Sequence, residues 1–162
     1  MPDYWANAMT WLRASTPEPF GSDALYTARY GTTNPAASYT VMNWWDQGYW
    51  IVQAGHRVPV SNPTQVKAPS AAAFYTATDE AEALAMLAAE RARYVLVDWE
   101  LPFRDASEGT LAGRFQNLAD WAGIPTTRFY SLCYTHGREG EPWQPIWLFH
   151  EQIGRASCRE RV

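Results

Sequence analysis

Lysine is almost absent from this chain of 162 residues: Lys67 is the only one, and the formal net charge is −4 at pH 7. Surfaces that bind nucleic acid carry clustered lysine and arginine, which neutralise phosphates. The composition therefore argues against a nucleic-acid partner. Long apolar runs are missing as well, since no stretch approaches the roughly 20 uncharged apolar residues that span a bilayer.

Familiar catalytic and metal-binding motifs are also missing. The sequence contains no Gly-rich phosphate loop, no serine-nucleophile elbow and no HExxH pattern. The three histidines, at positions 56, 136 and 150, are too scattered to give metal-ligand spacing. The sequence therefore predicts no metal ion and no catalytic residue within this chain.

Aromatic residues are the unusual presence, with nine tryptophans and nine tyrosines. Hydrophobic residues make up 47% and charged residues 19%, which is typical of a globular fold. Aromatics at this density serve large cores, amphipathic binding surfaces or segments near a membrane boundary.

Hydrophobic spacing and turn residues predict an alternation of short helices and strands. The expected helices lie at 3–14, 49–54, 70–76, 79–91 and 110–121, and the expected strands at 38–42, 56–60, 94–98 and 127–130. The apolar run at 94–98 is typical of a strand buried on both faces of a sheet. This order indicates one mixed α/β domain over residues 1–152.

The last ten residues, 153–162, resemble translated sequencing-adapter DNA read in frame. We therefore exclude this segment from the expected domain, as one would a cloning scar. A basic C-terminal tail is the alternative interpretation.

The segment Trp44-Trp45-Asp46-Gln47-Gly48 has the clearest chemical meaning. An indole N–H only donates and a carboxylate only accepts, so together they can hold a hydroxyl, which does both. A site built in this way rejects analogues that lack the hydroxyl. Glycine at position 48 allows a tight exit or a close backbone approach by a ligand. In the alternative, both tryptophans belong to the core and Asp46 caps the next helix.

These residues resemble the WWDYG signature of the catalytic subunit of oligosaccharyltransferases of the STT3/AglB/PglB type, with Gln47 where that family usually has tyrosine. The similarity extends to residues 5–17, to 48–62, to 76–98 and to 147–151. It covers essentially all of residues 1–152. The resemblance implies the central-core fold of that subunit's domain, here truncated at both ends.

The resemblance also implies a function. Trp44, Trp45 and Asp46 would bind the Ser or Thr hydroxyl of an Asn-X-Ser/Thr acceptor sequence. A basic residue followed four positions later by an aliphatic one marks a second family element, and Arg114 and Leu118 have that spacing on one helix face. In that element Leu111 stands where the family has aspartate. The alternative places Leu118 in the core and Arg114 on the surface.

The other expected partners belong to the complete enzyme. A lipid-pyrophosphate-linked glycan would be the donor, and a divalent metal, Mn²⁺ or Mg²⁺, would lie in the missing membrane domain. The family implies that this domain lies on the extracytoplasmic side of the membrane and that the fragment alone is inactive.

Alternative functions remain at this point. The first is a stand-alone carbohydrate-binding module whose aromatic side chains stack on sugar rings. The second is an interaction domain in which Trp44 and Trp45 are only core residues. Asp98 with Glu100 could also suggest glycosidase chemistry, although a loop role is favoured.

Overall fold

The computed structural model describes residues 1–26, 36–102, 105–107, 110–135 and 142–150. The chain divides into two compact units, Met1–Val97 and Asp98–Val162. The adapter-like segment 153–162 lies outside the described residues. In the described parts, no helix combines the length and the apolar character that crossing a membrane requires.

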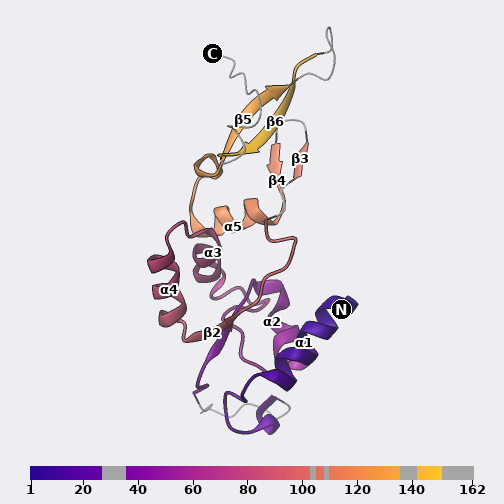
Figure 1. Ribbon diagram of the computed structural model, residues 1–162, viewed down its shortest axis with the longest axis vertical. Helices are drawn as coiled ribbons and strands as arrows, with labels where there is room; N and C mark the ends of the chain where they lie inside the picture. Colours follow the sequence, from indigo (N-terminus) through magenta and orange to yellow (C-terminus); the bar gives the residue numbers. More distant parts are fainter. Residues whose placement is uncertain (27–35, 103–104, 108–109, 136–141, 151–162) are drawn as a thin grey trace. The chain divides into compact units, whose positions relative to one another are not determined.

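Unit 1 holds four helices, two short 3₁₀ turns and two strands among its described residues (Figure 1). In chain order these are α1 (Asp3–Ser15), η1 (Asp23–Tyr26), β1 (Thr40–Met42), η2 (Trp45–Gln47), α2 (Gly48–Gln53), α3 (Ala68–Thr76), α4 (Glu80–Ala89) and β2 (Ala92–Val95).

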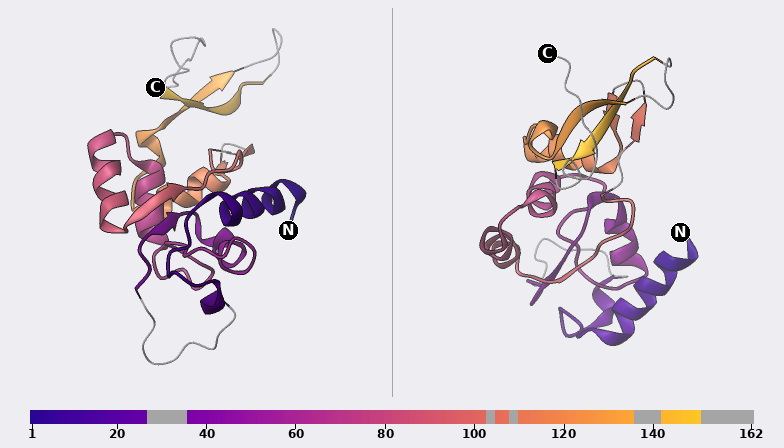
Figure 2. Two further views of the ribbon diagram at one scale, coloured as in Figure 1. Left: turned by 60° about the horizontal axis from the view of Figure 1, so that its bottom comes forward. Right: turned by 45° about the horizontal axis from the view of Figure 1, so that its top comes forward.

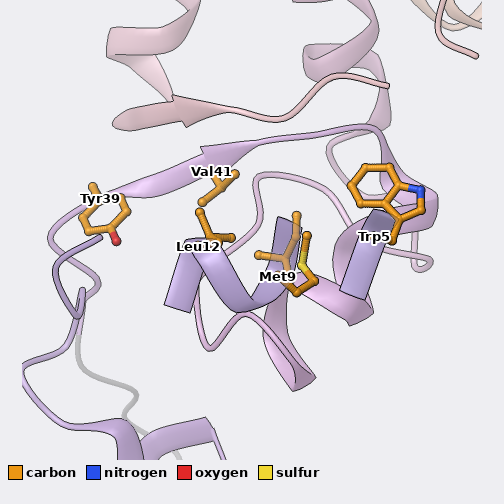
Figure 3. Close-up of a cluster of buried hydrophobic side chains, with 6 residues drawn as sticks. Trp5, Met9, Leu12, Tyr39 and Val41 are labelled. Carbon is orange, nitrogen blue, oxygen red and sulfur yellow. The ribbon is translucent and has the colours of Figure 1, made fainter. Parts of the chain in front are cut away.

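Helix α1 supplies one wall of the core of unit 1. Its residues Trp5, Met9 and Leu12 are spaced for one helix face and are all buried. They pack with Tyr39, Val41 and Ile51 in a single cluster, and Figure 3 shows the α1 side chains pointing towards β1. The helix ends at Ser15 because Thr16 precedes a proline and takes an extended conformation.

Strand β1 belongs to a sheet of two strands. It pairs in parallel with β2, with Met42 opposite Val95, and the chain between the two strands contains η2, α2, α3 and α4. On its other side Val41 forms a parallel bridge to Pro59. The predicted strand at 56–60 is therefore only this bridge. His56, at φ 47°, has a left-handed backbone, which extended pairing does not allow.

Strand β2 begins earlier than predicted and is less buried. Arg91, at φ 52°, ends α4, and the chain enters the strand at Ala92. Burial alternates along this segment: Tyr94 and Leu96 pack against the core, whereas Val95 and Val97 are 42% and 66% exposed. The expectation of a strand buried on both faces is wrong for the structure of this chain.

The start of α4 follows the sequence signal. Asp79 is its N-cap, and its carboxylate accepts a hydrogen bond from the backbone N–H of Glu82 at 2.9 Å. The acidic residues expected at this helix start are therefore where the helix dipole favours them.

Unit 2 contains two antiparallel strand pairs, one helix and a 3₁₀ turn in its described part: β3 (Asp105–Ser107), β4 (Thr110–Ala112), α5 (Arg114–Ala122), η3 (Thr126–Arg128), β5 (Tyr130–Thr135) and β6 (Gln144–Phe149). Strand β3 pairs with β4, and β5 pairs with β6, with Leu132 opposite Trp147. Both views of Figure 2 show β5 and β6 side by side as a twisted ribbon.

Two predictions for unit 2 are wrong in their boundaries. The helix expected from 110 begins only at Arg114, because Gly113, at φ 110°, has a backbone conformation that separates β4 from α5. The strand expected at 127–130 is a 3₁₀ turn followed by β5. Helices and short strands nevertheless alternate, so the mixed α/β class is confirmed.

Candidate functional site

The Trp-Trp-Asp segment lies in a turn just after β1. The strand ends at Met42, and residues Trp45–Gln47 form the 3₁₀ turn η2. The turn is closed by the backbone N–H of Gln47, which donates to Trp44 O at 3.3 Å. Trp44 therefore precedes the turn, and Trp45 is its first residue.

The two indoles have different surroundings. Trp44 is 3% exposed, whereas Trp45 and Asp46 are each partly exposed. The two tryptophan rings lie 6.1 Å apart at an angle of 54°. As whole residues, Trp45 and Asp46 are thus partly accessible, whereas the burial of Trp44 matches the alternative that places the tryptophans in the core.

Asp46 does not cap the following helix. Helix α2 begins at Gly48, and its N-cap is Gln47, whose side chain makes no capping hydrogen bond. One oxygen of Asp46, Oδ1, is buried, although the residue as a whole is partly exposed. The N-cap alternative for Asp46 is therefore wrong.

Gly48 packs closely against another segment of the protein's own backbone. Its φ and ψ of −56° and −40° are ordinary helical values, so no special turn is needed. A Cβ at this position would lie 2.4 Å from Ser61 O and 2.5 Å from Asn62 Cα. The expected close approach is real, but the group that approaches is the 61–62 segment of this chain.

A buried amide next to the motif was missed by the sequence analysis. The Asn43 side chain is 0% exposed, and its Nδ2 donates to Trp44 O at 2.6 Å and to Ser61 O at 2.8 Å. No local pattern points to Ser61, because it lies 18 positions further along the chain. The only available signal was an asparagine directly before the motif.

The second expected element lies in unit 2, on α5. Leu118 is 1% exposed and belongs to the core of that unit, while Arg114 Nε lies 2.8 Å from Glu100 Oε2. The expected shared helix turn is present. The burial of Leu118 favours the core alternative for this residue, and the role of both residues in acceptor binding stays a prediction.

Asp98 has a loop role, whereas the Glu100 carboxylate pairs with Arg114. Asp98 Oδ1 accepts hydrogen bonds from the backbone N–H groups of Glu100 and Leu101, each at 2.9 Å. Over the described residues, no three His, Cys, Asp or Glu side chains gather as a metal site would require.

An ionic cluster lies elsewhere in unit 1. Asp23 bridges the His56 ring and the Arg13 guanidinium, with Oδ2 2.6 Å from Arg13 Nη2. The hydrogen bond with His56, followed by the positive charge of its neighbours, lowers the pKa of Asp23. Tyr26 stacks on the His56 ring at 5.0 Å, and burial raises the pKa of the Tyr26 hydroxyl. This cluster joins η1 to the end of α1.

A known family, whose description is AglB core domain, matches residues 3–102, a range that includes this turn. This chain belongs to the AglB core domain family. Its similarity to AglB of Haloferax volcanii, a dolichyl-monophosphooligosaccharide–protein glycotransferase, is 31% identity over 153 residues. That alignment covers 85% of this chain and 14% of the relative.

Solved structures from Archaeoglobus fulgidus resemble the fold. The C-terminal globular domain of an oligosaccharyltransferase superposes with a TM-score of 0.61 at 27% identity, covering 79% of this chain and 72% of that one. Another oligosaccharyltransferase from the same organism superposes at 26% identity. Its complex with Zn and sulfate gives a TM-score of 0.69 and covers 90% of this chain and 19% of that one. Its form tethered to an acceptor peptide with an NVT sequon gives 0.65, with 90% and 18% covered.

This AglB core domain therefore spans only a small part, 14%, of the curated relative from Haloferax volcanii.

Proposed function

We propose that this chain is the acceptor-recognition part of an oligosaccharyltransferase, which transfers a lipid-linked glycan to asparagine in Asn-X-Ser/Thr sequences. The observation that carries the proposal is the turn itself: a partly exposed indole and carboxylate, Trp45 and Asp46, follow a buried indole within a chain of the AglB core domain family. The relatives' names and the NVT-peptide complex of one of them support it.

The proposed mechanism is selection by hydrogen bonding. Asp46 accepts a hydrogen bond from the Ser or Thr hydroxyl, and Trp45 donates its indole N–H to the oxygen of that hydroxyl. A bound hydroxyl fixes the position of the asparagine two residues earlier, which raises the chance that its amide reacts. Arg114 and Leu118 are proposed as secondary contacts of the acceptor.

The rest of the enzyme supplies the chemistry. A divalent metal, with Mn²⁺ or Mg²⁺ as the proposed ions, and the lipid-pyrophosphate-linked glycan would be held by a membrane portion, and residues 1–152 would lie on the extracytoplasmic side. The family's zinc and sulfate complex is consistent with a cation in the complete enzyme. The adapter-like segment 153–162 is proposed to be foreign to the domain.

The test uses a complete enzyme in which this chain replaces the matching region of the Haloferax volcanii relative. Turnover is compared for a Thr acceptor peptide and for the same peptide with α-aminobutyrate, which lacks the hydroxyl. Trp45→Phe is expected to lower the preference for Thr by roughly two- to tenfold, the worth of one neutral hydrogen bond. Asp46→Ala is expected to lower it by roughly ten- to a hundredfold, because the Asp46 carboxylate is charged.

Asp3→Ala, which changes an exposed aspartate in the first turn of α1, is the matched control and should leave the preference unchanged. A wild-type preference in Asp46→Ala would contradict the proposed site. Binding of free glycan by the chain, without any peptide, would instead favour a carbohydrate-binding module.

A further inference from the structure

The side-chain amide of Asn43 links two segments that flank the proposed acceptor site. Both of its Nδ2 hydrogens are used, one on Trp44 O at 2.6 Å and one on Ser61 O at 2.8 Å. Its Oδ1 lies 3.4 Å from the backbone nitrogen of Ser61, which completes a ring of contacts like that of paired strands. The amide is therefore fixed in a single orientation.

The bond to Trp44 O reaches the turn that carries Asp46. Trp44 O also accepts from the backbone N–H of Gln47, and this second bond closes η2 around Asp46. The carbonyl belongs to the peptide group that joins Trp44 to Trp45. Any rotation of that peptide group changes the direction of both proposed contact residues. The Asn43 amide therefore fixes the orientation of the backbone from which they project.

The far end of the turn meets the same segment. The Ser61 carbonyl that accepts from Asn43 would lie 2.4 Å from a Cβ on Gly48, so the Gly48 Cα is in close contact with it. The Ser61 backbone is thus linked to the start of the turn through the Asn43 side chain and meets the end of the turn directly at Gly48. A turn held at both ends has little freedom to reorient.

We infer that Asn43 is a positioning residue for acceptor selection: it anchors the turn 44–48 to Ser61 and so sets the direction in which Trp45 and Asp46 meet a hydroxyl. This inference rests on the proposed function of that turn. Binding sites discriminate well only when neighbouring bonds hold their contacting groups in place, because a loose group fits a substrate and its analogue almost equally.

The experiment measures the ratio of kcat/KM for the Thr peptide to that for the α-aminobutyrate peptide, in the complete enzyme carrying this chain. The ratio does not depend on how much enzyme is folded, so a purely structural role for Asn43 would leave it unchanged. Asn43→Ala is expected to lower the ratio by roughly two- to tenfold, through the loss of hydrogen bonds that orient the turn.

Asn43→Ser supplies a graded variant, since a hydroxyl can donate to only one of the two carbonyls. Its ratio should fall between those of the wild type and Asn43→Ala, and it provides the measurement if the alanine variant folds too poorly to assay. Asn7→Ala changes an exposed asparagine of α1 and should leave the ratio at the wild-type value.

A double-mutant cycle separates this inference from the proposed function. If Asn43 acts through Trp45 and Asp46, then Asn43→Ala has little further effect on the ratio when Trp45→Phe and Asp46→Ala are both already present. A full additional drop overturns the positioning role. A lowered ratio in Asp46→Ala together with an unchanged one in Asn43→Ala overturns the inference about Asn43 alone. An unchanged ratio in Asp46→Ala overturns the acceptor site itself.

Discussion

Replacing Gly48 by alanine sets two effects of opposite sign against each other. The backbone at Gly48 is helical, at φ −56° and ψ −40°, and alanine is favoured over glycine in a helix by up to about 1 kcal/mol. Against this, the new Cβ would lie 2.4 Å from Ser61 O, 2.5 Å from Asn62 Cα and 2.6 Å from Asn62 Cβ.

The steric effect is the larger one. All three contacts involve backbone or Cβ atoms, which cannot rotate away as the end of a long side chain can. Overpacking of this kind typically costs about 1–3 kcal/mol. Moving Ser61 also weakens its bond from Asn43, which is worth about 1 kcal/mol. After the gain in helix propensity, the expected loss in the free energy of unfolding is about 2 kcal/mol.

The assay is thermal unfolding of the chain followed by circular dichroism. For a protein of this size, a loss of about 2 kcal/mol lowers Tm by roughly 4–8 °C. Gly123→Ala provides a contrast, because Gly123 has a φ of 67° and no atom within 4 Å of a Cβ there, so only backbone strain acts. An unchanged or raised Tm in Gly48→Ala would refute the reasoning that the close approach decides the outcome.

Two further predictions concern the end of α1. Arg57 is 2% exposed, and its guanidinium donates hydrogen bonds to Thr16 Oγ1, His56 O, Arg13 O and Thr16 O. Arg57→Met should therefore lower the free energy of unfolding, measured in urea, by about 3 kcal/mol. An unchanged urea midpoint would contradict this. Asp23 has a pKa below its ordinary value of 3.8, so its ionised form stabilises the fold above that pH and the contribution is lost as pH falls through the folded-state pKa. Asp23→Asn should therefore reduce the decrease in the free energy of unfolding that the wild type shows below about pH 4. If the free energies of unfolding of the variant and the wild type ran parallel between pH 2 and about pH 6, the Asp23 carboxylate would not contribute to this decrease.

The parts of the fold that follow from local spacing were predictable. The spacing of Trp5, Met9, Trp11 and Leu12 predicted helix α1, of which Trp11 is exposed and the other three are buried, and Asp79 predicted the start of α4. Both depend on residues within one or two helical turns of each other. The proposed hydroxyl-binding residues are likewise three consecutive positions, and their role stays a prediction.

The parts that depend on distant segments were not predictable. Ser61 contacts the turn from 18 positions away, so nothing near Asn43 announces its partner. The left-handed backbone at His56 interrupts the expected strand, and because of the positive φ of Gly113 the expected helix begins later in the chain. Each of these backbone conformations depends on packing within its unit, which the spacing of residues along the sequence does not show.

Gln47 shows how the structure resolves a departure from the family signature. The WWDYG signature has tyrosine at this position, and the difference leaves the three proposed contact residues, Trp44, Trp45 and Asp46, in place. Gln47 is 2% exposed, and its side-chain Oε1 is buried, whereas Trp45 and Asp46 are partly exposed. The changed residue therefore lies on the inner side of the turn, where it affects packing. Its backbone N–H still closes the turn on Trp44 O, a bond that any residue except proline can make.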